Sequence, residues 1–218
     1  MTDEDSTHGK GNRRQRTRRP APPTPGPPPP GPLPTEALLH EAALNHLARF
    51  AATETGLRRV LERRVDRWAR RSESAGEPPD AIAAHAAEAK RQAAAVARKL
   101  VSSGAVDDAA FAAARARRLS RSGRSRRAIA AHLAAKGVAR GTADAALPDG
   151  EDAELDSALA FCRRRRTGPF APEGLSQEAR RKALAALARA GFSRSVAETA
   201  LDSAPGDAEA RLAALRQS

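Results

Sequence analysis

An internal repeat in the C-terminal half constrains the fold of this chain more than any other feature. The segment from Arg127 to Leu147 aligns with the segment from Arg181 to Leu201 at a constant offset of 54 residues and without a gap. Shared alanines mean little in an alanine-rich chain, but both segments also keep a helix–Gly–apolar–x–Arg–helix frame around Gly137 and Gly191. Repeated units of this size complete their cores by stacking on their neighbours, which predicts an elongated or curved array.

The composition predicts an all-α protein. Aromatic residues make up only 3% of the chain, there is no tyrosine, and no run of β-branched residues alternates with a period of two. Alanine dominates the apolar residues and buries little surface per side chain, so thin helix-on-helix packing is favoured over a sandwich or barrel. We expect three tandem tri-helical repeats in an elongated, curved array, preceded by a disordered N-terminal tail.

The second of these repeats has the clearest helix boundaries. Asp107 or Asp108 can cap the first helix, because a carboxylate there accepts the unpaired backbone N–H groups of the first turn. Four apolar side chains then share one face at helical spacing: Phe111, Ala112, Ala116 and Leu119. Lys136-Gly137 predicts the end of the next helix, with glycine in the left-handed position and Val138 packed against the cap.

Composition changes along the chain divide it into five segments. Ten prolines lie between Pro20 and Pro34, after a short acidic start and a basic run, so this part predicts an extended, disordered linker. The predicted boundaries are as follows: a basic, proline-rich tail over 1–34, the first repeat over 35–104, the second over 105–149, the third over 150–204, and a C-terminal tail or short helix over 205–218.

The formal charge of +12 favours an anionic partner, either nucleic acid or an acidic protein surface. A coding sequence rich in G and C would also raise the arginine content without selection on charge, so a purely compositional origin of the charge stays open. A single cysteine cannot form an internal disulfide, which fits a reducing cytoplasm. No apolar run approaches the roughly 20 residues that span a bilayer, and we expect no membrane contact.

No catalytic, cofactor or metal site is predicted. The five histidines show no ligand spacing and one cysteine cannot build a zinc site. We expect Cys162 to be a small buried hydrophobic residue, the adjacent Asp107 and Asp108 to act as helix caps, and Trp68 to anchor the core of the first repeat.

Basic side chains provide the remaining functional signal. Between Phe111 and Arg127 there are seven arginines and no acid, and helical spacing puts Arg117, Arg118 and Arg121 opposite the apolar face. Arg115 falls within the apolar sector, so its stem must snorkel or the helix must be rotated. A solvated face is the alternative interpretation. The full candidate anion-binding set is Arg117, Arg118, Arg121, Arg124, Arg126, Arg127, Lys136, Arg163, Arg164, Arg165, Arg166, Arg180, Arg181 and Lys182.

Four stretches, in order, resemble the RecX family of regulators of the RecA recombinase. They are ALNHLARF (43–50), VDDAAFA (106–112), SGRSRRAIAAHLAAKGV (122–138) and LARAGFSRSVAETAL (187–201), and the match covers about residues 37 to 202. The segment from Thr53 to Arg58 departs from the family's Ser-x-x-Glu-Leu pattern, and so do the proline-rich tail and the alanine-loaded third helix of the first repeat.

The resemblance implies a non-enzymatic modulator without a cofactor. RecX-like proteins have three tandem tri-helical repeats, bind RecA in the groove of its filament on DNA, and limit filament extension, strand exchange and ATP hydrolysis. They can also bind single- or double-stranded DNA through phosphates. We therefore expect a cytoplasmic, monomeric regulator of homologous recombination and the DNA-damage (SOS) response. The rivals are a basic helix-turn-helix protein acting in transcription or nucleoid organisation, and a scaffold whose tail tethers other proteins.

Overall fold

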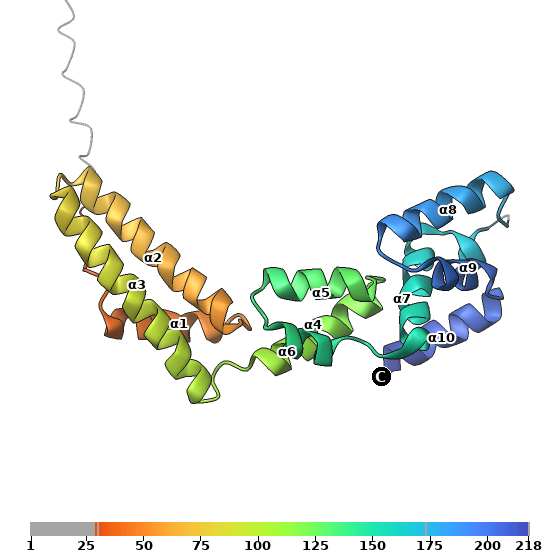
Figure 1. Cartoon of the computed structure of the whole chain (residues 1–218), viewed down its shortest axis with the longest axis horizontal. Coiled ribbons are helices and arrows are strands. Elements are labelled where there is room, and N and C mark those ends of the chain that lie inside the picture. The colour runs from red at the N-terminus through yellow and green to blue at the C-terminus, as the bar shows by residue number, and fades with distance from the viewer. Residues whose placement is uncertain (1–28, 30, 173, 218) are drawn as a thin grey trace, which may run out of the picture.

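The computed structural model describes residues 29, 31–172 and 174–217. Over these residues the chain forms ten α-helices and one short 3-10 helix and contains no β-strand, which confirms the all-α prediction. Figure 1 shows the helices in three groups that follow one another along an elongated, shallowly curved row. Apart from residues 29 and 31–34, the tail predicted over 1–34 lies outside the described residues.

The first repeat is built on a long helical pair. Its helices are α1 (Glu36–Leu47), α2 (Glu54–Ser74) and α3 (Pro79–Ser102). Figure 1 shows α2 and α3 side by side along most of their length, with α1 against their lower part. Leu57, Leu61 and Val65 point from α2 into a core shared with α1 and α3. Trp68 is only 6% exposed, as expected for a core anchor.

The second repeat has the smallest core of the three. Its helices are α4 (Asp108–Arg121), α5 (Arg126–Ala135) and α6 (Arg140–Ala146). Seven buried residues form this core, and three of them are alanines: Ala112, Ala116, Ile129, Leu133, Val138, Ala143 and Leu147. Gly137 has φ +81°, and the Val138 amide donates to the Leu133 carbonyl at 3.1 Å, so the predicted glycine cap of α5 is confirmed.

The third repeat carries an additional helix. It comprises α7 (Gly150–Arg165), the 3-10 helix η1 (Gly168–Phe170), α8 (Gln177–Arg189), α9 (Arg194–Asp202) and α10 (Pro205–Gln217). Of the two forms expected for residues 205–218, the structure shows a helix, because α10 buries Ala208 and Leu212 in the core of this repeat. Gly191 has φ +95° and closes α8 as Gly137 closes α5.

The first and second repeats are joined where the start of α2 meets the end of α5 (Figure 1). The Thr53 hydroxyl accepts the Gly56 amide at 2.9 Å, which caps α2, and donates to the Lys136 carbonyl at 2.7 Å. The Glu54 amide donates to Asp108 Oδ1 at 2.9 Å. Thr53 is 2% exposed, so both hydrogen bonds satisfy a hydroxyl that water cannot reach.

The second and third repeats are joined in the same way. The Ser125 hydroxyl accepts the Ala128 amide at 3.2 Å, which caps α5, and donates to the Ala190 carbonyl at 2.6 Å, at the end of α8. The Arg126 amide donates to Glu154 Oε2 at 2.9 Å. Each joint therefore combines a capping hydroxyl, a helix-end carbonyl beside a left-handed glycine, and a carboxylate from the first helix of the next repeat.

The sequence left open whether Asp107 or Asp108 acts as a helix cap. In the structure each of the two carboxylates binds the start of a different helix. Asp107 caps its own helix, since its Oδ1 accepts the Ala110 amide at 2.8 Å. Asp108 instead accepts from Glu54 in the preceding repeat, so it stabilises the start of α2. Both carboxylates thus bind helix N-termini, one within the repeat and one across the joint.

Replacing Gly137 tests the first joint. A Cβ at Gly137 would lie 2.4 Å from Thr55 Cβ, whereas one at Gly76, whose φ is a matching +83°, meets no atom within 4 Å. Gly76→Ala should cost about 1 kcal/mol for the left-handed backbone alone. Gly137→Ala should cost roughly 1–3 kcal/mol more, because the joint must open. Urea unfolding of both variants measures the difference, and equal losses would show that the joint does not constrain this position.

Candidate anion-binding surface

The exposed side of α4 carries three arginines without a carboxylate partner among the described residues. Ala112, Ala116 and Ser120 are buried, while Phe111 and Leu119 are half-buried, so the predicted apolar face of α4 is confirmed. Arg117, Arg118 and Arg121 lie on the exposed side as expected. These arginines line two different hollows. Arg118 lines one beside the first repeat, and Arg117 and Arg121 line one beside the third.

Arg118 borders a cleft of about 760 Å³ between the first and second repeats. The floor is largely apolar and includes Ala110, Phe111 and Phe50, which is 61% exposed. Arg49 and Arg115 also line this cleft, and Asp107 is its single acidic lining residue. The cleft therefore has a basic rim over an apolar floor.

The stem of Arg115 crosses from α4 to α5. Its Nε donates to Nε2 of His132 at 3.0 Å, and both residues are half-buried. This contact places Arg115 near the apolar face without burying its charge, so its stem snorkels as one of the two expected arrangements requires. The pKa of His132 is lowered by burial and, next, by the charge of Arg115.

The structure brings the arginines of α4 and α7 together at the second joint. Arg121, Arg163 and Arg164 line one pocket of about 350 Å³, whose apolar wall is formed by Ala160 and by two leucines of α10. Arg164 Nη1 donates to the Ser122 carbonyl at 2.8 Å, which ties α7 to the end of α4. Arg121 has no ion pair with a described residue, so the pocket keeps an uncompensated charge.

Phe161 supports the arginine run at the end of α7. The Arg165 guanidinium lies 4.9 Å from its ring centroid and that of Arg164 lies 5.7 Å away, both within cation–π range. Arg166 closes the helix in the left-handed region with φ 52°. Cys162 is fully buried, and burial raises the pKa of its thiol to about 11, which confirms the expected inert hydrophobic residue.

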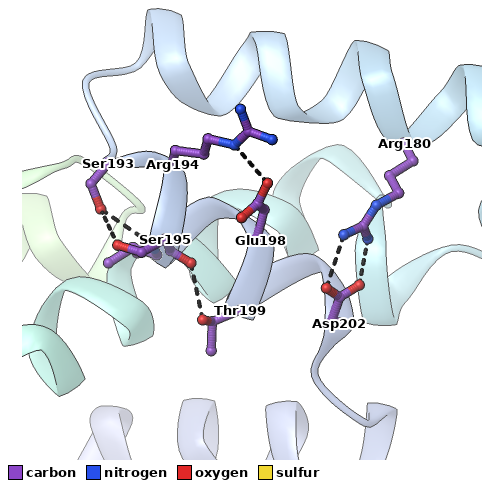
Figure 2. A network of polar contacts seen from close by, with 8 residues as sticks. Arg180, Ser193, Arg194, Ser195, Glu198, Thr199 and Asp202 are labelled. Atoms are coloured by element: carbon purple, nitrogen blue, oxygen red, sulfur yellow. Dashed lines mark hydrogen bonds and ion pairs between the residues drawn. The ribbon is translucent and has the colours of Figure 1, made fainter.

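Other members of the predicted set already have carboxylate partners. Figure 2 shows Arg180 bound to both oxygens of Asp202, with Nη2 at 2.9 Å from Oδ2, and this bond raises the pKa of Arg180. Lys182 pairs with Glu178 at 2.6 Å and Arg163 with Glu209 at 3.6 Å.

Around the start of α5 the charges are mixed. Arg126 Nη1 lies 3.8 Å from Asp149 Oδ1, and its backbone amide is bound by Glu154, whose pKa is raised by burial. Arg126 and Arg127 therefore line an open hollow together with acidic side chains. The predicted residues without a carboxylate partner in the described part of the chain are Arg117, Arg118, Arg121, Arg124, Arg127, Lys136, Arg164, Arg165, Arg166 and Arg181.

Helix α2 carries a set of arginines that the sequence reasoning did not single out. All seven of its arginines are exposed: Arg58, Arg59, Arg63, Arg64, Arg67, Arg70 and Arg71. Their positions relative to the acids of α2, at helical spacing, would have revealed the set from the sequence.

Two further searches covered the described residues. Within the described residues, no three histidine, cysteine or acidic side chains gather as ligands for a metal ion. No helix in the same part of the chain is long and apolar enough to cross a membrane.

The fold and this surface define a class: an all-helical protein of tandem three-helix repeats with exposed, uncompensated arginines. A family model described as "RecX, second three-helix domain" matches residues 107–147. The regulatory protein RecX of Myxococcus xanthus is 42% identical over 169 residues, which covers 75% of this chain and 83% of that protein. The chain belongs to the RecX family.

Further relatives agree with this assignment. The regulatory protein RecX of Agrobacterium fabrum is 43% identical over 89 residues, 41% of this chain and 47% of that protein. A crystal structure of a regulatory protein RecX aligns with a TM-score of 0.52 at 20% identity, covering 77% of this chain and 72% of the other. RecX from Lactobacillus salivarius aligns with a TM-score of 0.50 at 17% identity, covering 77% and 96%. At these identities the two structures support the fold alone.

The Arg115–His132 contact predicts a pH dependence. His132 Nε2 accepts a hydrogen bond only when it is unprotonated, and the pKa of His132 is lowered in the folded state. The unfolded state therefore binds more protons below its ordinary pKa of about 6.5, and stability should fall as pH drops through that value.

Two measurements check this. Denaturation between pH 7 and pH 5 should show a smaller loss of stability in His132→Gln than in the unmodified protein. By NMR titration, Arg115→Gln should raise the pKa of His132 more than Arg124→Gln does, because Arg115 has the larger effect on it. Equal shifts in the two variants would contradict the assigned cause.

Proposed function

We propose that this protein regulates the RecA recombinase by binding RecA and its filament on DNA and by limiting recombinase and ATPase activity. Support comes from membership of the RecX family and from the named regulatory relatives. It acts through binding rather than catalysis, as a cytoplasmic monomer in recombination, DNA repair and the SOS response. The observation that carries the proposal is the group of arginines without a carboxylate partner where α4 meets α7: Arg117, Arg121 and Arg164.

The elongated shape and the charge suit this role together. A helical nucleoprotein filament offers a long groove with DNA phosphates, and a row of small repeats can follow such a groove more readily than a globular domain. Figure 1 shows α4 in the middle of the row. This helix carries the exposed Arg117, Arg118 and Arg121. The same side chains contact single- or double-stranded DNA non-specifically, since a contact to phosphate oxygens carries no direct information on base sequence.

A helix-turn-helix regulator of transcription is the second candidate. The short helices α5 and α6 follow one another across a glycine turn, as such a motif requires. Asn and Gln recognise adenine at base edges, and α4, α5 and α6 contain neither, so arginine is the main base-reading side chain that these helices offer. This composition favours phosphate contact and the regulatory role.

Titration against RecA assembled on single-stranded DNA tests the proposal. ATP turnover should fall when the protein is present at well below one copy per RecA, because one bound molecule can block further filament extension. Unchanged turnover, together with tight sequence-specific duplex binding, would assign the protein to the helix-turn-helix class instead.

The three α4 arginines should dominate filament binding. Replacing Arg117, Arg118 and Arg121 together by glutamine should weaken binding at least tenfold and flatten its salt dependence by about two to three counterions. The matched control removes three arginines that each have an acidic partner on the same helix: Arg91, Arg140 and Arg194. An equal loss in the control would show that net charge alone matters.

A further inference from the structure

Helix α2, in the first repeat, separates its charges by sign. Placed at about 100° per residue, Glu62, Asp66 and Glu73 fall within roughly 40° of one another. Six arginines fill an adjacent sector of about 140° that contains no acid after the first turn: Arg59, Arg63, Arg64, Arg67, Arg70 and Arg71. A compositional excess of arginine would distribute both signs around the helix, so this separation calls for another cause.

Ion pairs on α2 leave these six arginines uncompensated. Glu62 pairs with Arg58 at 3.4 Å, and Asp66 pairs with Lys90 of α3 at 2.7 Å. Two of the four acids of α2 are therefore engaged outside the arginine sector. Among the described residues, none of the six arginines has an ion pair, and Arg59 uses Nη1 to donate to the Ala135 carbonyl across the first joint. We call these six residues the α2 arginine face.

One side of this face opens into a hollow. Arg64, Arg67 and Arg71 line a volume of about 230 Å³ together with Trp68 and part of the segment before α1. Their i, i+3 and i+7 spacing puts the three guanidinium groups on one side of α2. No acidic residue lines the hollow, so it presents positive charge and guanidinium N–H donors to a small anionic group.

The shape of the face selects a repeating anion. From Arg59 to Arg71 the helix extends about 18 Å at 1.5 Å per residue. A duplex carries one phosphate charge per about 1.7 Å of its axis, and arginine forms paired hydrogen bonds with phosphate oxygens. Extended rows of phosphates therefore match the face better than one isolated anion does.

The surrounding side chains favour a duplex over a single strand. Single-strand binding depends on aromatic platforms on which bases stack, but Trp68, the one aromatic residue of α2, is only 6% exposed. The helix also contains no Asn or Gln to contact base edges. We propose that the α2 arginine face binds the phosphate backbone of duplex nucleic acid, independently of base sequence.

This site is separate from the arginines of α4 and α7. The two sets belong to different repeats, and in Figure 1 most of α2 extends away from α4 on the far side of the first joint. The proposed duplex site does not rest on regulation of RecA, because binding to naked DNA is measured without RecA. The α2 face would hold flanking duplex while the other repeats contact a filament.

The test is fluorescence anisotropy with a labelled duplex, a single strand of the same length, and the full chain. Replacing Arg63, Arg67 and Arg70 by glutamine should weaken duplex binding at least tenfold at about 0.1 M salt and reduce the salt slope by two to three. These side chains are exposed and make no joint contact, and circular dichroism verifies that the helices remain. The basic N-terminal run is present in every variant, so its contribution cancels in the comparison.

The same control, glutamine at Arg91, Arg140 and Arg194, removes an equal charge from paired positions and should weaken duplex binding less than threefold. The proposal is overturned by any of three results: an equal loss in the control, no loss in the α2 variant, or tighter binding of the single strand than of the duplex. Competition by polyglutamate as strong as by duplex would reassign the face to an acidic protein and would also overturn it.

Discussion

The array depends on two hydroxyls, which cap the second helix of the first and of the second repeat and also bond to the repeat that follows. Thr53 and Ser125 each hold two hydrogen bonds at a buried position, one to their own helix and one to a neighbouring helix end. The carbonyls they reach belong to Lys136 and Ala190, directly before the left-handed glycines. Only a residue without a Cβ allows this approach, because a side chain there would meet Thr55 or Ser125 within about 2.4–2.7 Å.

These joints compensate for a weak middle repeat. The second core has seven residues, three of them alanines, and so buries less apolar surface than its neighbours. Further contacts fasten it to the third repeat, where Ser120 and Ser157 share a hydrogen bond of 2.7 Å and Gly123 lies against the backbone of Phe161. The positive end of α2 meets the negative end of α5, and α5 meets α8 likewise, so the helix dipoles favour the same order. Because these contacts hold α4 against α7, they also determine where the arginines of α4 lie.

Local sequence signals were sufficient to predict the all-α class and many of the helix boundaries. Capping residues, helix-ending glycines and the repeat depend on short-range physics, and Asp107, Gly137 and the apolar face of α4 lie as expected. Interactions between distant segments were not predictable, since neither the bond from Glu54 to Asp108 nor that from Ser125 to Ala190 leaves a local signature. For the same reason the sequence could not show that Arg180 has Asp202 as a partner while Arg121 has none. The charges of α2 were the exception, because their separation is helical and local.

The difference between paired and unpaired arginines bears on whether the charge is functional. An exposed pair such as Arg194–Glu198 adds little to stability because water screens it, so such pairs are explained by local stability and solubility. Arginines gathered in a sector without acids, as in the α2 arginine face, instead repel one another and weaken the free protein. An anion that binds only the folded state removes that repulsion and stabilises the fold by RT ln(1 + [L]/Kd). The arginines of α2 and α4 that have no carboxylate partner are therefore the places where binding free energy can be gained. Arg180 and Lys182 of α8, which already have carboxylate partners, offer less.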